Sequence, residues 1–252
     1  MIARLVRKVV PDRWKGNEFL TRHTRAQCGS RVQRGPFAGM RYIERAADSA
    51  YLQRLLGIYE RELHGVVEKA CALGLAQIVN PGAAEGYYAV GMALRNPQAR
   101  VLAFERDPQV RSALVEMVRI NSVGDRLQIG GFCGMAELNA SLEHAKGKTL
   151  VVCDIEGGEE VLLDPQAAPG LRSCWMLVEV HEFVKRGIGD TLMNRFSTTH
   201  RVEQIWQEPR SASEYPFKNM ATRLLPRRYL EWAVREPRPE RMSWLWMEPR
   251  QA

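Results

Sequence analysis

Cysteine is rare in this 252-residue sequence, and no long uninterrupted apolar run occurs in it. The cysteines are odd in number, widely spaced and without a C-x-x-C pair, which argues against a disulfide framework and a zinc site. No apolar run approaches the roughly 18 residues of a membrane-spanning helix. The start, MIARLVRKVVPDRW, lacks the apolar core of a secretory signal. We therefore expect a protein of the reducing cytoplasm. The five cysteines are Cys28, Cys71, Cys133, Cys153 and Cys174.

Acidic residues are scarce in residues 1–45, which hold most of the basic excess behind the net charge of +7. The rest of the chain is close to neutral. Ile2, Leu5, Val6 and Val9 recur at helical spacing, and basic residues occupy the other faces. Three interpretations remain open for this arm: a helix on an anionic membrane surface, a solvated helix docked on its own domain, or contact with a phosphate-bearing substrate such as a nucleotide sugar or anionic glycan.

The segment 77–88, QIVNPGAAEGYY, joins a short apolar run to a glycine turn and a helical pattern. Strand, glycine turn and helix form the opening unit of a doubly wound sheet. A dinucleotide fingerprint counted from Gly82 needs a glycine where Tyr87 stands. The observed Gly82-x-Ala84-x-Gly86 spacing instead resembles the G-x-G-x-G loop of class I S-adenosylmethionine-dependent methyltransferases.

Later segments alternate strands with helices, which predicts an α/β fold with a mainly parallel sheet. RVLAFE ends in Glu105, about 20 residues after the glycine turn, where an acid can accept ribose hydroxyls. Asp107-Pro108 predicts the start of a helix that runs to about residue 121. Further strands are expected at 126–130, which the GGFCG turn of residues 130–134 follows, and at 149–154, 174–180, 201–207 and 242–247. Residues 209–226 are loop-like.

The N-terminal part predicts a helical cap. The pattern of residues 50–73 is typical of one long amphipathic helix that ends near Gly74. Tyr59 and Glu60 on this helix, and the nearby Arg41-Tyr42, are candidate cap residues over an acceptor pocket. We expect two units: a basic arm with a helical cap over residues 1–72, and a cofactor-binding domain over residues 73–252.

The segment after the fourth strand carries the most specific resemblance. Asp154, Glu156, Gly157 and Glu159 match the D-x-E-G-x-E pattern of FkbM-type methyltransferases, and the resemblance covers about residues 77–183. It implies a seven-stranded class I methyltransferase-type sheet and S-adenosylmethionine as cofactor. Asn80-Pro81 departs from the family, which usually has an acid followed by an aliphatic residue, so we assign Asn80 only a hydrogen bond to the cofactor. The implied cofactor contacts are Asn80, Gly82, Ala83, Ala84, Glu85, Gly86, Glu105, Arg106, Gly131, Phe132, Cys133 and Asp154.

Catalytic groups are expected at the carboxyl ends of the central strands, where open α/β sheets bind ligands. The expected catalytic residues are His181, Asp154, Glu179 and Glu156. Glu179 and His181 share one face of their strand, and we expect His181 to be the general base. Its alternative role is that of a hydrogen-bonded histidine at a strand end. A divalent metal held by Asp154, Glu179 and His181 is a further, less favoured, possibility.

The resemblance implies O-methylation of a hydroxyl on a small molecule or glycan; composition and spacing do not select oxygen over nitrogen. Two alternatives stay open. One is a methyltransferase acting on RNA or another nucleic acid, which the basic arm favours. The sequence lacks a Pro-Cys pair after the fourth strand and an Asn-Pro-Pro-Tyr-type motif, and both absences count against it. The other is a non-catalytic cofactor-fold protein that binds through its basic arm.

Overall fold

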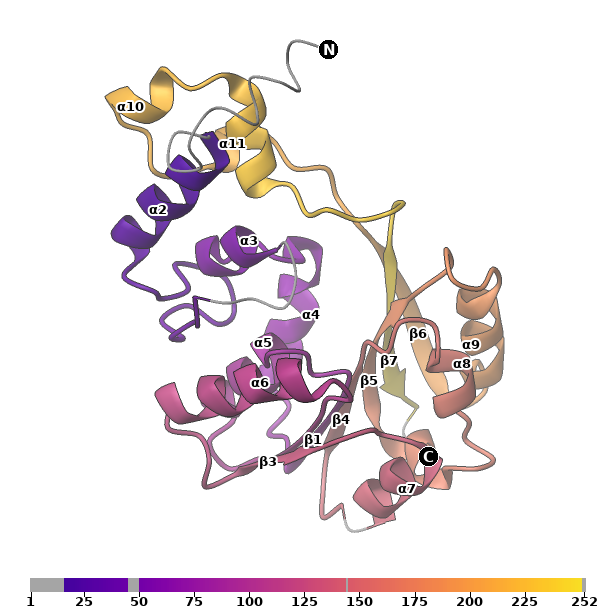
Figure 1. The fold of residues 1–252 in the computed structure, drawn as a ribbon. Coiled ribbons are helices and arrows are strands. Elements are labelled where there is room, and N and C mark those ends of the chain that lie inside the picture. Colours follow the sequence, from indigo (N-terminus) through magenta and orange to yellow (C-terminus); the bar gives the residue numbers. More distant parts are fainter. Residues whose placement is uncertain (1–15, 45–49, 144, 251–252) are drawn as a thin grey trace.

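The computed structural model describes residues 16–44, 50–143 and 145–250. The helix predicted over residues 2–9 lies outside these ranges. The described chain forms a seven-stranded sheet in the order β3-β2-β1-β4-β5-β7-β6, with helices on both sides (Figure 1). Strands β1 to β5 pair in parallel, and β7 runs antiparallel to both of its neighbours, β5 and β6. The strands are β1 Gln77–Pro81, β2 Arg100–Phe104, β3 Leu127–Gly130, β4 Thr149–Cys153, β5 Trp175–Val180, β6 His200–Trp206 and β7 Ser243–Pro249.

Helices follow most strands, as the sequence predicts. The Asp107 side chain accepts hydrogen bonds from the Gln109 and Val110 N–H groups and thereby caps the helix after β2. The α-helices are α2 Gly16–Cys28, α3 Tyr51–Leu56, α4 His64–Cys71, α5 Tyr87–Arg95, α6 Pro108–Ile120, α7 Met135–Glu143, α8 Glu159–Leu162, α9 Ile188–Phe196, α10 Met220–Arg223 and α11 Arg227–Val234. Short 3₁₀ turns occupy η2 Arg61–Leu63, η3 Pro169–Ser173 and η4 Ala212–Glu214.

Alternate residues of the central strands face two separate apolar layers. Ile78 of β1 joins the cluster that includes residues of α4, α5 and α6, whereas its neighbour Val79 joins the cluster that includes residues of α7, α8 and α9. A sheet buried on both faces explains why the strands are nearly continuous apolar runs. The predicted doubly wound α/β fold with a mainly parallel seven-stranded sheet is confirmed.

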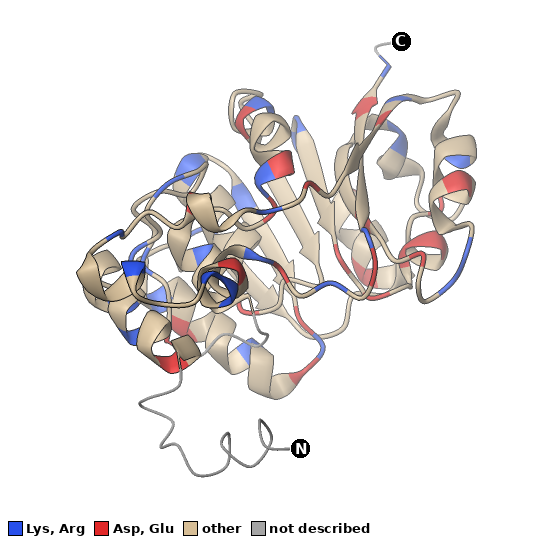
Figure 2. Cartoon of the chain, turned by 90° about the horizontal axis from the view of Figure 1, so that it is seen from above, with Lys and Arg blue, Asp and Glu red and all other residues tan. Residues whose placement is uncertain are grey.

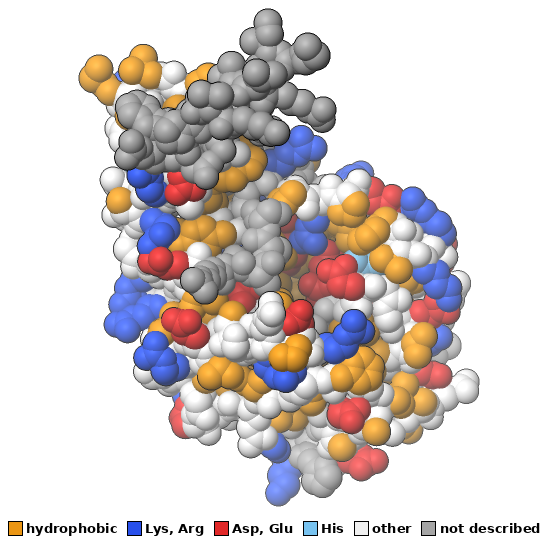
Figure 3. All heavy atoms as spheres, viewed as in Figure 1, with side chains coloured by type: hydrophobic (Ala, Val, Ile, Leu, Met, Phe, Trp, Pro, Cys, Tyr) orange, Lys and Arg blue, Asp and Glu red, His pale blue; other side chains and the backbone are white. Residues whose placement is uncertain are grey.

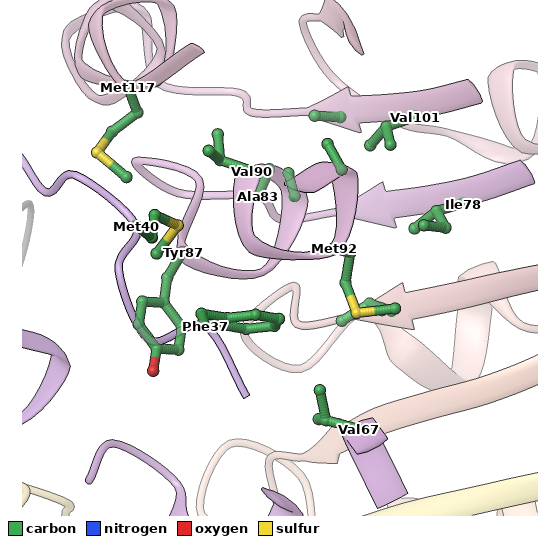
Figure 4. Packing of buried hydrophobic residues seen from close by; sticks show 14 of the residues in the cluster. Phe37, Met40, Val67, Ile78, Ala83, Tyr87, Val90, Met92, Val101 and Met117 are labelled. Atoms are coloured by element: carbon green, nitrogen blue, oxygen red, sulfur yellow. The ribbon is translucent and has the colours of Figure 1, made fainter. Parts of the chain in front are cut away.

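The N-terminal segment packs directly on α5. Phe37 lies beneath this helix with its ring 5.3 Å from the ring of Tyr87 (Figure 4). Gly91 makes this approach possible, because a Cβ there would stand 2.5 Å from the Phe37 ring. Gly91 is a weak helix former, but packing against Phe37 requires a glycine at this position of α5.

The cap draws on two distant parts of the chain. Helix α2 lies beside α11, which belongs to the long connection between β6 and β7 (Figure 1). A Cβ on Gly16 of α2 would stand 2.6 Å from the Tyr229 ring of α11. Sequence patterns missed both helices, and the boundary expected at residue 72 stays a prediction. The apolar cluster of the cap consists of Leu20, Leu52, Leu56, Ile58, Tyr215, Ala233 and Val234.

The single long helix predicted over residues 50–73 is wrong. The chain leaves helical geometry at Gly57, whose φ of +67° closes α3. A Cβ at Gly57 would stand 1.9 Å from the Arg34 carbonyl oxygen, so the backbone near Arg34 occupies the space of a side chain. Glu60, with φ +46°, makes a second break. Because the helix is broken at Gly57 and Glu60, Tyr59 and Glu60 line a pocket at the carboxyl ends of the central strands.

Two global expectations can be checked in the described chain. All five cysteines are free, which agrees with the absence of a disulfide framework. Among the described residues, no helix has the length and apolar composition needed to span a bilayer.

Replacing Gly57 by Ala should destabilise the protein by about 2–5 kcal/mol, because it adds the cost of a left-handed residue to a backbone clash. The matched control is Gly65→Ala in α4, where a Cβ meets nothing within 4 Å and helix propensity favours alanine. Urea unfolding of both variants gives the comparison. Equal stability of the two variants would contradict the role assigned to Gly57.

Candidate active site

The loop after β1 lies at the switch point of the sheet, where β1 has β2 on one side and β4 on the other. Open α/β sheets bind ligands in this crevice. Gly82 sits directly against β4's continuation: a Cβ there would stand 1.5 Å from the Asp154 carbonyl oxygen. Its φ of +72° also favours glycine. Residue 82 must therefore be glycine for the two strand ends to meet.

Glu105 fixes the shape of this loop. Its carboxylate accepts hydrogen bonds from the Ala84 N–H at 3.0 Å and the Asp107 N–H at 2.7 Å. Ala84 has φ +46°, and Gly86, at +99°, lies so close to Leu114 that a Cβ would stand 2.5 Å from that side chain. An ionised carboxylate has about four lone-pair positions, so Glu105 retains acceptor capacity toward a ligand.

Asn80 presents an unsatisfied acceptor at the same place. The residue is 2% exposed, and its Nδ2 donates to the Val152 carbonyl at 2.9 Å. Its Oδ1 has no hydrogen-bond partner among the described residues. Because a buried acceptor without a partner costs free energy, a donor from a bound molecule would stabilise this arrangement.

The first pocket opens beside the loop and is rich in carboxylates and tyrosines. Glu60, Asp154 and Glu179 contribute its acidic groups. Glu85, expected to contact a cofactor, also lines it, but its carboxylate pairs with Arg54 at 2.5 Å and accepts a hydrogen bond from Tyr42. The lining residues include Arg54, Tyr59, Glu60, Asn80, Gly82, Ala83, Ala84, Glu85, Tyr87, Tyr88, Asp154, Glu179 and Trp244.

The turns after β2 and β3 lie outside the lining of this pocket. Arg106, Gly131 and Phe132 are exposed, with Phe132 at 65%. Cys133 is buried, and burial raises the pKa of its thiol to about 12. Their cofactor contacts, expected from the sequence, stay predictions.

His181, just after β5, meets three acids from the segment after β4. Its Nδ1 is 2.8 Å from the Glu159 carboxylate. Its Nε2 is 3.5 Å from an oxygen of Asp154 and 3.5 Å from an oxygen of Glu156. His181 and Glu159 are 2% and 0% exposed, whereas the Glu156 side chain reaches solvent. Figure 3 shows acidic side chains beside a histidine in the hollow between the cap and the sheet.

These neighbours shift the ionisation of the site. Burial alone would lower the pKa of His181, but the hydrogen bond with Glu159 and the charge of Asp154 outweigh it, so the pKa is raised. Burial raises the pKa of Asp154 to about 6, although His181 opposes the rise. A raised pKa keeps more of the imidazole protonated at neutral pH. A smaller fraction of His181 is therefore in the unprotonated form that a general base requires at neutral pH.

Glu179 takes a different partner from the one that the sequence predicts. Its carboxylate pairs with Arg238 at 2.5 Å. It also shares a hydrogen bond with Asp154, and burial together with Asp154 raises the pKa of Glu179 well above its ordinary value. The structure therefore groups Asp154 and His181 with Glu156, whereas Glu179, which touches this group through Asp154, pairs with Arg238.

A second pocket of about 190 Å³ adjoins this cluster. Tyr59 lines both pockets and stands between them. The walls of the second pocket combine acidic and aromatic groups with the Pro-Arg-Pro segment before β7. Its lining residues are Ala50, Tyr59, Glu156, His181, Phe183, Glu236, Pro237, Arg238, Pro239 and Met242.

Two arginines from the β6–β7 connection, Arg210 with a buried side chain and Arg238 with a partly buried one, form ion pairs with the surrounding acids. Arg238 pairs with Glu60 and Glu179, while Arg210 pairs with Glu62 at 2.6 Å and with Glu236 at 2.8 Å. Figure 2 shows acidic and basic positions close together on the loops beyond the carboxyl ends of the central strands. Sequence reasoning missed both arginines, because an arginine in a loop carries no periodic signal that would place it in a core.

Replacing Arg238 by Met should cost about 3–5 kcal/mol of stability, because it leaves the buried carboxylates of Glu60 and Glu179 without a counter-charge. The loss should be smaller at pH 5 than at pH 8, since carboxyl groups can take up protons at low pH. Arg186→Met, at an exposed pair with Glu240, is the control and should change stability little. A loss that does not depend on pH would contradict this explanation.

Glu236 should make stability fall as pH rises. Burial and the nearby Glu60 raise the pKa of Glu236 from 4.5 to about 7. The folded protein therefore holds this proton more tightly than the unfolded chain, and the resulting stabilisation is complete below about pH 4.5 and lost as pH rises through 7. Relative to Glu236→Gln, the unmodified protein should lose about 3 kcal/mol over this window. Chemical unfolding at several pH values measures it; Glu231→Gln, at an exposed pair with Arg227, should show no such trend.

Comparisons with known proteins give a likeness in fold. No protein-family model matches the chain, and no curated protein matches its sequence. An rRNA methylase from Streptococcus thermophilus is 8% identical, over 76% of this chain and 98% of that one, with a TM-score of 0.48. A precorrin-6y C5,15-methyltransferase from Geobacter metallireducens is 10% identical over 75% and 89%, with a TM-score of 0.46. A fibrillarin pre-rRNA processing protein from Methanococcus jannaschii is 9% identical over 69% and 67%, with a TM-score of 0.43. Similarity at this level does not indicate the activity of this chain.

Proposed function

We propose that the protein is an S-adenosylmethionine-dependent methyltransferase that acts on a hydroxyl group of a small molecule or glycan. One observation carries the proposal. A glycine loop, tied to Glu105 by its own backbone, borders an acid-lined pocket at the switch point of the sheet. The hydroxyl acceptor follows from the resemblance of the segment 154–159 to FkbM-type methyltransferases.

The residues of the first pocket fit this cofactor. S-Adenosylmethionine carries a positive sulfonium and an ammonium group, and the acids of the pocket lining, Glu60, Glu85, Asp154 and Glu179, outnumber its one arginine, Arg54. The orphaned Oδ1 of Asn80 can accept a hydrogen bond from the bound molecule. Glu105 lies outside the pocket lining but binds the Ala84 N–H of the loop that borders it, and it has the acceptor capacity to bind ribose hydroxyls. When bound, the cofactor supplies an electrophilic methyl group.

The second pocket is suited to hold the acceptor. It meets the first pocket at Tyr59, so an acceptor placed there would lie next to the cofactor site. Arg54 lies 4.3 Å from the centre of the Tyr59 ring and Arg238 5.6 Å from it, and these contacts hold the ring in place. The acceptor proton leaves toward the cluster of Asp154, Glu156 and His181.

The D-x-E-G-x-E residues have distinct roles in this arrangement. Asp154 and Glu156 face His181, and Glu159 fixes the orientation of the imidazole through Nδ1. Gly157 has φ +101°, and a Cβ there would stand 2.6 Å from Val184. All four motif residues help to form or shape the cluster around His181, and this supports our proposal that the protein is of the FkbM type.

Binding of S-adenosylmethionine and S-adenosylhomocysteine, measured by calorimetry, tests the proposal. Glu105→Ala should weaken binding by about 10- to 100-fold, the value of hydrogen bonds to a charged group. Glu116→Ala, an exposed acid on α6, should leave affinity unchanged.

Melting temperatures of both variants control for loss of folding. The proposal fails if the unmodified protein binds neither molecule.

A further inference from the structure

We propose that Asp154, Glu156 and His181 form a binding site for one divalent transition-metal ion, such as Mn²⁺ or Zn²⁺. Binding of the ion depends on how these three side chains are placed. The role of the ion in catalysis rests on the proposed function.

The three side chains converge at metal-ligand spacing. One ligand atom from each lies within 4.8 Å of the others, and the His181 Nε2 is 3.5 Å from both carboxylate oxygens. A charge-assisted hydrogen bond is shorter, about 2.7–2.9 Å. Metal bonds of about 2.0–2.1 Å in tetrahedral geometry separate two ligand atoms by about 3.3–3.4 Å. The observed separation is thus closer to that of two ligands around one ion than to that of a hydrogen bond.

His181 is oriented as a metal ligand. Its Nδ1 contacts the Glu159 carboxylate at 2.8 Å, and Glu159 is fully buried. A carboxylate that accepts from one ring nitrogen fixes the tautomer and raises the basicity of the other nitrogen. Metal binding would displace the proton from Nε2, whose lone pair would then be directed at the space it shares with Asp154 and Glu156. Glu159 lies outside the ligand set, so its contact is an independent feature that points to an ion.

The ligand types and the surrounding charge select the class of ion. One imidazole and two carboxylates suit Mn²⁺, Fe²⁺ or Zn²⁺ better than a site of oxygen ligands alone would. Arg238 neutralises Glu179 and Glu60, but it pairs with neither Asp154 nor Glu156 in the described contacts. A divalent cation would balance the two remaining carboxylates. This ligand set differs from the one expected from the sequence, because Glu156 takes the place of Glu179.

Three protein ligands leave coordination positions open. Glu156 and His181 both line the second pocket, so an open position faces the proposed acceptor. A hydroxyl bound there would lose its proton more readily, because a divalent ion lowers the pKa of a bound oxygen. His181 would then act as a metal ligand, the ion would replace it in activating the acceptor, and the hydroxyl proton would pass to the solvent that reaches Glu156.

Metal titration of the full, untagged chain, after dialysis against a chelator, tests the site. Calorimetry with Zn²⁺ and electron paramagnetic resonance with Mn²⁺ should show one saturable site without any cofactor or acceptor. Glu159→Gln should weaken binding by about 10- to 100-fold, the usual effect of losing a carboxylate behind a histidine ligand. Glu156→Gln should weaken it at least as much, and because Glu156 is 79% exposed, this variant should fold normally.

Glu160→Gln is the matched control, because Glu160 lies in the same segment but pairs with Lys185. It should bind the ion as the unmodified protein does. Absence of a saturable site in the unmodified protein, or an affinity in Glu156→Gln and His181→Gln equal to that of the unmodified protein, would overturn the proposal. Because no cofactor is present, a negative result leaves methyl transfer standing, and failure to bind S-adenosylmethionine leaves the metal result standing.

Discussion

The guanidinium groups of Arg210 and Arg238 are the constraint on which the candidate site depends. They bring positive charge to the buried carboxylates of Glu60, Glu179 and Glu236, which are 2–3% exposed. A buried carboxylate without such a partner costs several kcal/mol. The same two side chains join the turn at Glu60, strand β5 and the segment before β7. Charge pairing therefore acts together with apolar packing to fix the walls of the two pockets.

The two arginines do not neutralise every buried acid of the site, and the acids that remain determine which ligands the site can bind. Asp154 shares a hydrogen bond with Glu179, and the pKa values of both carboxyls are raised, mainly by burial. A buried cluster with more acids than bases reduces its charge by retaining protons or by binding cations. Both proposed ligands, a sulfonium cofactor and a divalent ion, are cations. The electrostatic argument for one ligand therefore supports the other.

Much of the sheet could be predicted from the sequence. Each central strand is a short apolar run, and glycine turns or an Asp-Pro cap mark the helices that follow, so local signals and tertiary structure agree. The helix at 50–73 failed because its apolar spacing continues across Gly57, where the backbone near Arg34 enforces a break. Helices α2 and α11 were missed because they are stabilised mainly by packing on each other and on α3.

The candidate site was likewise predictable from the sequence only in part. Asp154, Glu156 and His181 were predictable, because each lies near the carboxyl end of a strand and parallel strands end at one edge of the sheet. The partners of Glu179 and Glu60 were not, because Arg238 arrives from the connection between β6 and β7. The breaks at Gly57 and Glu60 bring Tyr59 between the two pockets, and Arg54 and Arg238 hold its ring there. Periodicity assigns residues to strand ends and faces, whereas their ionic partners depend on how distant loops cross those ends.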